Sequence, residues 1–205
     1  GIRRRLAPLL DNDRRKIEVA NSILFTLIGS PIIYYGDEIG MGDNIWLPDR
    51  DSVRTPMQWT PDRNAAFSVA DPGKLYLPPI QSLVHNFTAV NIEAQLATPT
   101  SLLHWLRGML EIRRAHPVFG NGTAEILPSS HEAVLAYLRR NKEETVLCVA
   151  NLANTARAAT VTLPGLGGAT VRDAFGGAEF PPVPKDGRFT LTMGARDFFW
   201  LVVSK

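Results

Sequence analysis

The sequence predicts an α/β segment followed by a small antiparallel all-β domain. Residues 14–28 repeat apolar side chains at helical spacing, and a short apolar run at residues 32–35 follows them. After residue 120 the apolar period changes to two, with turn residues between successive short runs. The polar, turn-rich stretch at residues 37–95 is far longer than an ordinary connection, which indicates a functional loop.

The composition is that of a globular chain and excludes several functions. Of the 205 residues 45% are hydrophobic, enough for one medium domain or two small ones. The formal net charge is only +2, which argues against nucleic-acid binding. The single cysteine, Cys148, lies in an apolar run and excludes an internal disulfide, and no segment resembles a signal peptide or a membrane span. We therefore expect a cytoplasmic protein with no nucleic-acid or membrane partner.

The N-terminal helix and strand form half of a βαβ unit. The residues before the helix, Asp11 to Asp13, supply N-cap chemistry, and Gly29-Ser30-Pro31 ends it. The run Ile32–Tyr35 is typical of a fully buried strand. Because the chain offers this strand no neighbours nearby, we expect its partners upstream. The start at Gly1, without a methionine, fits a cut inside a larger polypeptide.

A second helix is predicted from Ser101 to His116, with Thr100 or Ser101 as its cap and Pro117 as its stop. The predicted strands of the β domain follow at residues 123–127, 133–139, 144–150, 157–163, 170–173, 188–193 and 197–203. We place the domain boundary so that residues 1–118 form the first part, including the loop at 37–95. Residues 119–205 form the β domain.

Two polar blocks carry the chemistry. The first, GDEIGMGDN at residues 36–44, places carboxylates directly after the predicted strand, where barrel enzymes hold their sites. The second, DRDSVRTPMQW at residues 49–59, mixes carboxylates, arginines and an aromatic ring. This mixture suits a sugar, because charged groups hydrogen-bond its hydroxyls and flat rings cover its C–H faces.

These blocks resemble glycoside hydrolase family 13, the α-amylase superfamily. The pattern Gly-x-Pro-x-x-Tyr-x-Gly-x-Glu at residues 29–38 resembles the stretch on its eighth barrel strand, and RTPMQW at residues 54–59 is similar to a motif of its α-glucosidase branch. With LYLPPI at residues 75–80 and AVNIEAQ at 89–95, the motifs most resemble the members that interconvert maltose and trehalose. The resemblance covers the whole chain. It implies the C-terminal end of a (β/α)8 TIM barrel followed by a small antiparallel β-sandwich domain.

The resemblance implies a retaining glucosyl transfer by three upstream carboxylates, the last in an Asn-His-Asp motif that this sequence lacks. We therefore expect no catalytic residue in this chain, which would be inactive alone and would need the N-terminal part of the same enzyme. Carried over by position, Glu38 and Arg54 bind the leaving or accepting sugar as a charge-assisted clamp. Asp51, Asn44 and Asp49 are secondary candidates.

The ligands that the resemblance implies are maltose, trehalose and glucose. Because the four histidines are too far apart for a zinc motif, no metal or cofactor is expected in this chain. Calcium would belong to the upstream part, and a homo-oligomer stays open.

Three alternatives stay open. An α-1,4- or α-1,6-glucosidase of the same branch would hydrolyse where the isomerase transfers. A carbohydrate-binding module built on residues 119–205 would bind glucan by itself. Glu38 and Asp51 would be the catalytic pair if their carboxyl groups lay about 5–5.5 Å apart.

For some polar and aromatic residues a structural role is an alternative to a functional one. The run Arg3-Arg4-Arg5 is interpreted as a solvated face that pairs with acidic groups, and Trp46 and Trp59 as pins of loops or core. The sequence departs from the family's usual pattern around Trp46, at residues 81–87, and at Ala65-Ala66, where a pair of glycines is usual. These departures leave loop conformation and substrate preference open.

Overall fold

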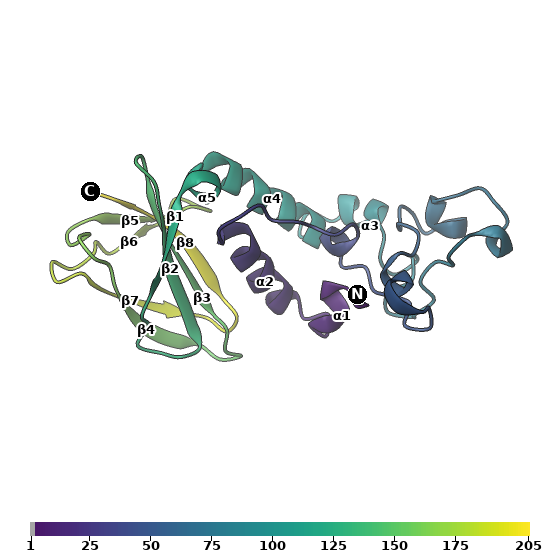
Figure 1. The fold of residues 1–205 in the computed structure, drawn as a ribbon, viewed down its shortest axis with the longest axis horizontal. Coiled ribbons are helices and arrows are strands. Elements are labelled where there is room, and N and C mark those ends of the chain that lie inside the picture. The colour runs from purple at the N-terminus through teal and green to yellow at the C-terminus, as the bar shows by residue number, and fades with distance from the viewer. Residues whose placement is uncertain (1–2) are drawn as a thin grey trace. The chain divides into compact units, whose positions relative to one another are not determined.

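The computed structural model describes residues 3–205 (Figure 1). The chain divides into two compact units, one running up to Ile17 and then over Ile32–Gly108, the other comprising Glu18–Pro31 and Met109–Lys205. The division cuts through two helices, α2 (Arg14–Thr26) and α4 (Leu102–Ala115). The boundary between these two units therefore differs from the domain boundary predicted after residue 118. The predicted domains stay a prediction.

The second unit contains the β domain. Its strands are β1 (Thr123–Leu127), β2 (Val134–Arg140), β3 (Thr145–Asn151), β4 (Arg157–Thr162), β5 (Thr170–Asp173), β6 (Glu179–Phe180), β7 (Arg188–Met193) and β8 (Phe198–Ser204). A six-stranded sheet has the order β1-β2-β3-β8-β5-β6, and β4 pairs with β7 in a second sheet. Every pairing is antiparallel. The seven predicted strands are confirmed to within one residue, whereas β6 is too short to give a periodic signal.

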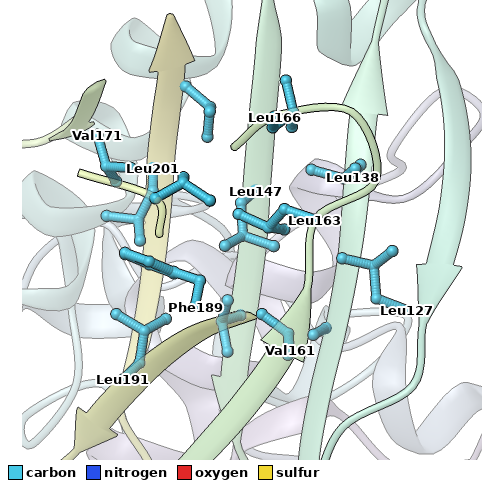
Figure 2. Close-up of a cluster of buried hydrophobic side chains, with 14 of the residues drawn as sticks. Leu127, Leu138, Leu147, Val161, Leu163, Leu166, Val171, Phe189, Leu191 and Leu201 are labelled. Atoms are coloured by element: carbon cyan, nitrogen blue, oxygen red, sulfur yellow. The ribbon is translucent and has the colours of Figure 1, made fainter. Parts of the chain in front are cut away.

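The two sheets enclose one hydrophobic core (Figure 2). Strand β7 alternates exposed and buried residues, so Phe189 and Leu191 point inward beside Leu147 and Leu201 of the larger sheet. Leu147 and Leu201 are fully buried, and each such side chain contributes about 1.5–3 kcal/mol. The predicted β-sandwich is therefore confirmed.

The larger sheet is also covered on its other face, by the C-terminal half of α2 and by α5 (Val118–Asn121). The indole N–H of Trp200 on β8 donates to Ser22 Oγ at 2.9 Å, and the Phe119 ring lies 5.0 Å from that of Trp200. Thr26 Oγ1 hydrogen-bonds the hydroxyl of Tyr137 on β2. Because both faces are packed, β3 and β8 are buried along most of their length.

Arg139 on β2 joins this helical layer to the sheet. Its side chain is only 1% exposed, and its guanidinium donates to main-chain carbonyls rather than to a carboxylate. The acceptors are the carbonyl oxygens of Thr26, Leu27, Val118, Phe119, Gly122 and Thr123. These carbonyls lie at the C-terminal end of α2, within the single turn of α5 and in the two residues that follow α5. At the end of α2 the cation compensates the negative end of the helix.

The first unit has little regular structure beyond its helices. It contains α1 (Leu6–Leu9), α3 (Ile92–Ala97) and the N-terminal parts of α2 and α4. The long loop has 3-10 turns at Asp37–Ile39, Asp49–Val53 and Pro72–Lys74, and a left-handed turn within Arg63–Ala66. Asp13 accepts from the N–H groups of Arg15 and Lys16, so the predicted cap of α2 is confirmed. Ser101 likewise caps α4.

The apolar run Ile32–Tyr35 is not the buried strand that the sequence predicts. It pairs with no strand in the part of the chain that the structure describes, and Ile32 is 83% exposed. A strand needs neighbours for its main-chain hydrogen bonds, and residues 3–205 provide none here. The prediction of burial is therefore wrong for this chain.

Three consecutive residues, Asn64, Ala65 and Ala66, adopt left-handed φ values of 56°, 59° and 52°. Asn64 is suited to this conformation and uses its side-chain amide to donate to the carbonyls of Ser68 and Ala70. The two alanines are not, since Cβ crowds the following carbonyl. They stand where the family pattern has glycines, so the loop keeps a glycine-type backbone without glycine.

Replacing Arg139 by leucine should destabilise the β domain strongly. The change removes the donors to buried carbonyls, which costs about 3 kcal/mol or more in free energy of unfolding. Urea denaturation followed by tryptophan fluorescence measures the loss. Arg172→Leu is the matched control, because this side chain is 65% exposed and its pair with Glu179 contributes less than about 1 kcal/mol. Equal losses for the two variants would contradict the role of Arg139.

Replacing Ala66 by glycine should stabilise the first unit. Ala66 is exposed and its φ is 52°, so glycine relieves backbone strain without opening a cavity, for a gain of about 0.5–1 kcal/mol. Thermal unfolding checks the direction. Ala94→Gly, within helix α3, should lose about 1 kcal/mol instead. A loss at both positions would show that Ala66 is not strained.

Candidate functional site

The first polar block begins at a turn that requires glycine. Gly36 has a φ of 90°, and a Cβ there would overlap the side chain of Met41. The chain therefore turns sharply after Tyr35 and enters the 3-10 turn Asp37–Ile39, which places Asp37 and Glu38 side by side.

Arg5 fixes this turn to the second polar block. Its side chain is buried, with 2% of the residue exposed, and its guanidinium donates to the carbonyls of Tyr35 and Val53. The guanidinium carbon lies 5.0 Å from the Tyr34 ring centre and 4.6 Å from that of Tyr35, within cation–π range. One cation thus holds together the ends of two loops that have almost no secondary structure.

Arg4 and Asp43 add a second tie. Arg4 Nε lies 3.0 Å from Asp43 Oδ2, and the Arg5 main-chain N–H donates to the same oxygen at 3.3 Å. The expected pairing of the arginine run with an acidic group is confirmed at Arg4. The expectation of a solvated face is wrong at Arg5, because carbonyl acceptors and aromatic rings replace its water.

The predicted clamp between Glu38 and Arg54 is not formed in the described part of the chain. Glu38 Oε2 accepts the main-chain N–H of Gly36 at 2.7 Å, so this carboxylate stabilises its own turn. Arg54 Nη1 lies 3.7 Å from Asp51 Oδ1, three residues earlier, in a half-exposed pair. The ion pair therefore joins two predicted site residues, although not the two that were expected.

Asn44 and Asp49 have clear structural roles. Asn44 is 8% exposed, accepts the Trp46 N–H through Oδ1 at 3.2 Å and donates its own N–H to the Ser52 carbonyl at 2.8 Å. Asp49 begins a 3-10 turn with a φ of 47°, and its carboxylate lies 3.3 Å from Arg50 Nε, whose hydrogen bond lowers the pKa of Asp49. Whether these residues also bind a ligand stays a prediction.

Arg54 lies between two hollows. One, of about 290 Å³, is lined by Asp37 and Tyr34 together with Arg4, Arg5 and Arg50. The other, of about 360 Å³, is lined mainly by aromatic and aliphatic residues, with Tyr35, Phe67 and Tyr76 among them. A guanidinium between a hollow that contains charged side chains and an aromatic hollow can donate to sugar hydroxyls while rings cover the C–H faces.

Sequence reasoning missed two residues of this region. Asp37 lines the smaller of the two hollows beside Arg54, and burial raises the pKa of its carboxyl while the nearby Arg5 opposes the rise. Its neighbour Glu38 was predicted as a site residue instead, although the order of the two acids in the sequence does not indicate which one lines the hollow. Arg5 had been grouped with two exposed arginines, and only its apolar neighbour Leu6 hinted at burial.

Residues 3–205 contain no group of three or more side chains suited to hold a metal ion. No helix in the same range has the length and apolar character needed to cross a bilayer.

Comparison with known protein families identifies the family of this chain. Residues 3–122 match the family described as "Alpha amylase, catalytic domain", and residues 124–200 match "Maltogenic Amylase, C-terminal domain". The chain belongs to the α-amylase family. The recognition made from its motifs is confirmed.

Two curated relatives are similar to the chain over almost its whole length. The chain is 52% identical over 204 residues to a trehalose synthase of Pimelobacter sp. (strain R48), aligning 98% of this chain with 35% of that protein. It is also 52% identical over 203 residues to "Trehalose synthase/amylase TreS" of Mycobacterium tuberculosis (strain ATCC 25618 / H37Rv), covering 98% of this chain and 34% of the relative. The chain thus spans about a third of the length of these curated relatives.

More distant relatives include glucosidases. An oligo-1,6-glucosidase of Heyndrickxia coagulans is 27% identical over 165 residues, which cover 64% of this chain and 28% of that protein. Among solved structures, trehalulose synthase MutB from Pseudomonas mesoacidophila MX-45 superposes with a TM-score of 0.72 at 23% identity, over 100% of this chain and 42% of that one. This likeness confirms the predicted fold class, a barrel end followed by a β-sandwich domain.

Replacing Arg5 by leucine should loosen the loops around Asp37 and Arg54. Two main-chain carbonyls lose a buried donor, so we expect trypsin to cleave after Arg50 and Arg54 about tenfold faster or more. Mass spectrometry of the fragments over time measures the rates. Arg3→Leu, at an exposed position, is the control, and equal acceleration in both variants would contradict the role of Arg5.

Proposed function

We propose that this chain is the C-terminal part of an enzyme that interconverts maltose and trehalose by intramolecular, retaining glucosyl transfer. One observation carries the proposal: the 52% identity to the Pimelobacter trehalose synthase extends over 98% of the chain, whereas the 27% identity to the glucosidase covers 64%. The similarity therefore includes the rim loops as well as the framework, and rim loops are where members of one fold family differ in function.

The rim hollows would hold the glucose released in mid-reaction. In a retaining mechanism one sugar stays covalently attached to the enzyme while the other departs. An isomerase must keep the departed glucose near the intermediate and exclude water. Arg54 supplies donors at the edge of both hollows, Asp37 supplies an acceptor in one of them, and Asp51 orients Arg54 through their ion pair. Their role is to orient this glucose, and the bond-breaking carboxylates would come from the upstream part.

The exposed run Ile32–Tyr35 supports an upstream partner. Its main chain has no strand neighbour among residues 3–205, and its position follows α2 as a barrel strand follows a helix. We infer that it closes the barrel by pairing with strands of the N-terminal part. The absence of an Asn-His-Asp motif from the sequence is consistent with this division, so the chain alone should be inactive.

Hydrolysis is the second candidate activity. The mycobacterial relative is named as both a trehalose synthase and an amylase, which supports hydrolysis as a second candidate for this protein. The balance between transfer and hydrolysis would depend on how well the rim retains glucose. We also propose a cytoplasmic location, since the one cysteine is buried and unpaired.

The full-length protein should form trehalose from maltose with little free glucose. Product analysis by chromatography or NMR measures the ratio of the two. Replacing Arg54 by alanine should raise the share of glucose and lower total turnover about tenfold or more, because a charge-assisted contact to the waiting sugar is lost.

Arg63→Ala is the matched control, since this arginine is exposed, lies in the same long loop and lines neither of the two hollows beside Arg54. Its product ratio should stay close to that of the unmodified enzyme. Glucose as the main product of the unmodified enzyme would establish a glucosidase and reject the isomerase.

A further inference from the structure

The two residues that flank Arg54 have their main-chain carbonyls hydrogen-bonded by side chains from outside the second polar block. The hydroxyl of Tyr35 lies 2.7 Å from the carbonyl oxygen of Thr55 and 3.2 Å from that of Val53. Arg5 Nη2 donates to the Val53 carbonyl at 2.7 Å. The main chain is therefore held on both sides of Arg54 by residues far from it in the sequence.

This anchoring decides where the Arg54 side chain points. Val53 and Thr55 are buried, whereas the side chain of Arg54 is half-exposed. Its ion pair with Asp51 is 3.7 Å long and open to solvent, so it adds only a weak constraint on the guanidinium. The direction in which the side chain leaves the loop thus depends chiefly on the main chain that the Tyr35 hydroxyl holds.

The Tyr35 ring is itself fixed from two sides. The guanidinium carbon of Arg5 lies 4.6 Å from its centre, and the Tyr34 ring is tilted against it with centroids 4.9 Å apart. Burial raises the pKa of Tyr35, although the charge of Arg5 opposes the rise. The hydroxyl therefore keeps its proton at neutral pH and acts as a donor to the buried carbonyl.

We infer that Tyr35 is a positioning residue whose hydroxyl, through the Thr55 carbonyl, directs the Arg54 guanidinium toward the glucose released in mid-reaction. The inference rests on the proposed function and adds to it a residue that sets the balance between transfer and hydrolysis. Arg54 touches the sugar, whereas the Tyr35 hydroxyl acts on Arg54. A displacement of about 1 Å in such a group is enough to impair a reaction that depends on orientation.

The balance is set when the covalent glucosyl intermediate is resolved. In transfer, a hydroxyl oxygen of the waiting glucose bonds to the anomeric carbon, the bond from that carbon to the enzyme carboxylate breaks, and the hydroxyl proton passes to the upstream acid/base carboxylate. In hydrolysis a water molecule takes the place of the glucose, and a second free glucose is released. A poorly oriented or escaping glucose therefore favours water.

Tyr35→Phe in the full-length protein tests this role, because the change removes one oxygen atom and keeps the ring. With maltose as substrate, we expect the share of glucose among the products to rise about threefold through the lost hydrogen bond. A merely structural role would reduce the amount of active enzyme and slow the formation of both products equally. The product ratio is therefore independent of any loss of stability.

Combining Tyr35→Phe with Arg54→Ala tests whether the hydroxyl acts through the arginine. The glucose share of Arg54→Ala should not rise further when the hydroxyl is also removed, because the group that it positions is already gone. A further rise as large as that in the enzyme with Arg54 would show that the hydroxyl acts on the sugar directly. That result would overturn the positioning role.

Tyr137→Phe is the matched control, since it removes the hydroxyl that is hydrogen-bonded to Thr26 in the other compact unit. It should lower the thermal unfolding temperature and leave the product ratio unchanged. An unchanged ratio in Tyr35→Phe, or an equal rise in Tyr137→Phe, would refute the positioning role alone.

Glucose as the main product of the unmodified enzyme would refute the isomerase instead. The kcat/KM for maltose hydrolysis, measured for the single and double variants, would then decide the positioning role. Losses from Tyr35→Phe and Arg54→Ala that multiply would overturn it, and a double variant no worse than Arg54→Ala would support it.

Discussion

A buried guanidinium needs hydrogen-bond acceptors inside the protein, and each of the two compact units contains one buried arginine that meets this need. Arg139 and Arg5 are almost fully buried, and neither has a carboxylate partner for its guanidinium among the described residues. Each donates to main-chain carbonyls, which belong to helix ends for Arg139 and to loop ends for Arg5. Because a cation without acceptors would be very costly there, each arginine dictates where several chain segments end.

This constraint bears directly on the candidate site. The rim loops contain short 3-10 turns and long irregular stretches, so hydrogen-bonded ladders do not hold them. Arg5 joins the Tyr35 and Val53 carbonyls, and Asp43 fixes the main chain next to it. These hydrogen bonds hold in place the two loops that bring Arg54 and Asp37 to the same hollow. The proposed role in orienting a glucose needs such preorganisation, because a misplacement of about 1 Å costs much of the rate.

The two hollows beside Arg54 and a third hollow at Trp46 divide the rim into different chemical surfaces. The former combine arginines with carboxylates and rings, and the latter combines one exposed indole with a buried carboxylate. All are formed within the part of the chain that matches the α-amylase catalytic domain. Arg4 lines both the hollow at Trp46 and the hollow that contains Asp37, so these two surfaces share a wall.

The sequence alone determined the elements that local patterning controls. Alternation located seven strands within one residue, caps located both long helices, and ordered motifs identified the family, because these signals depend on neighbours in the chain. The tertiary structure alone decided which polar groups meet. It paired Arg54 with Asp51 rather than Glu38, buried Arg5, left Trp46 and Ile32 exposed, and brought His85 onto Gly42. Such contacts join residues far apart in sequence or depend on loop geometry, and no periodic pattern records either.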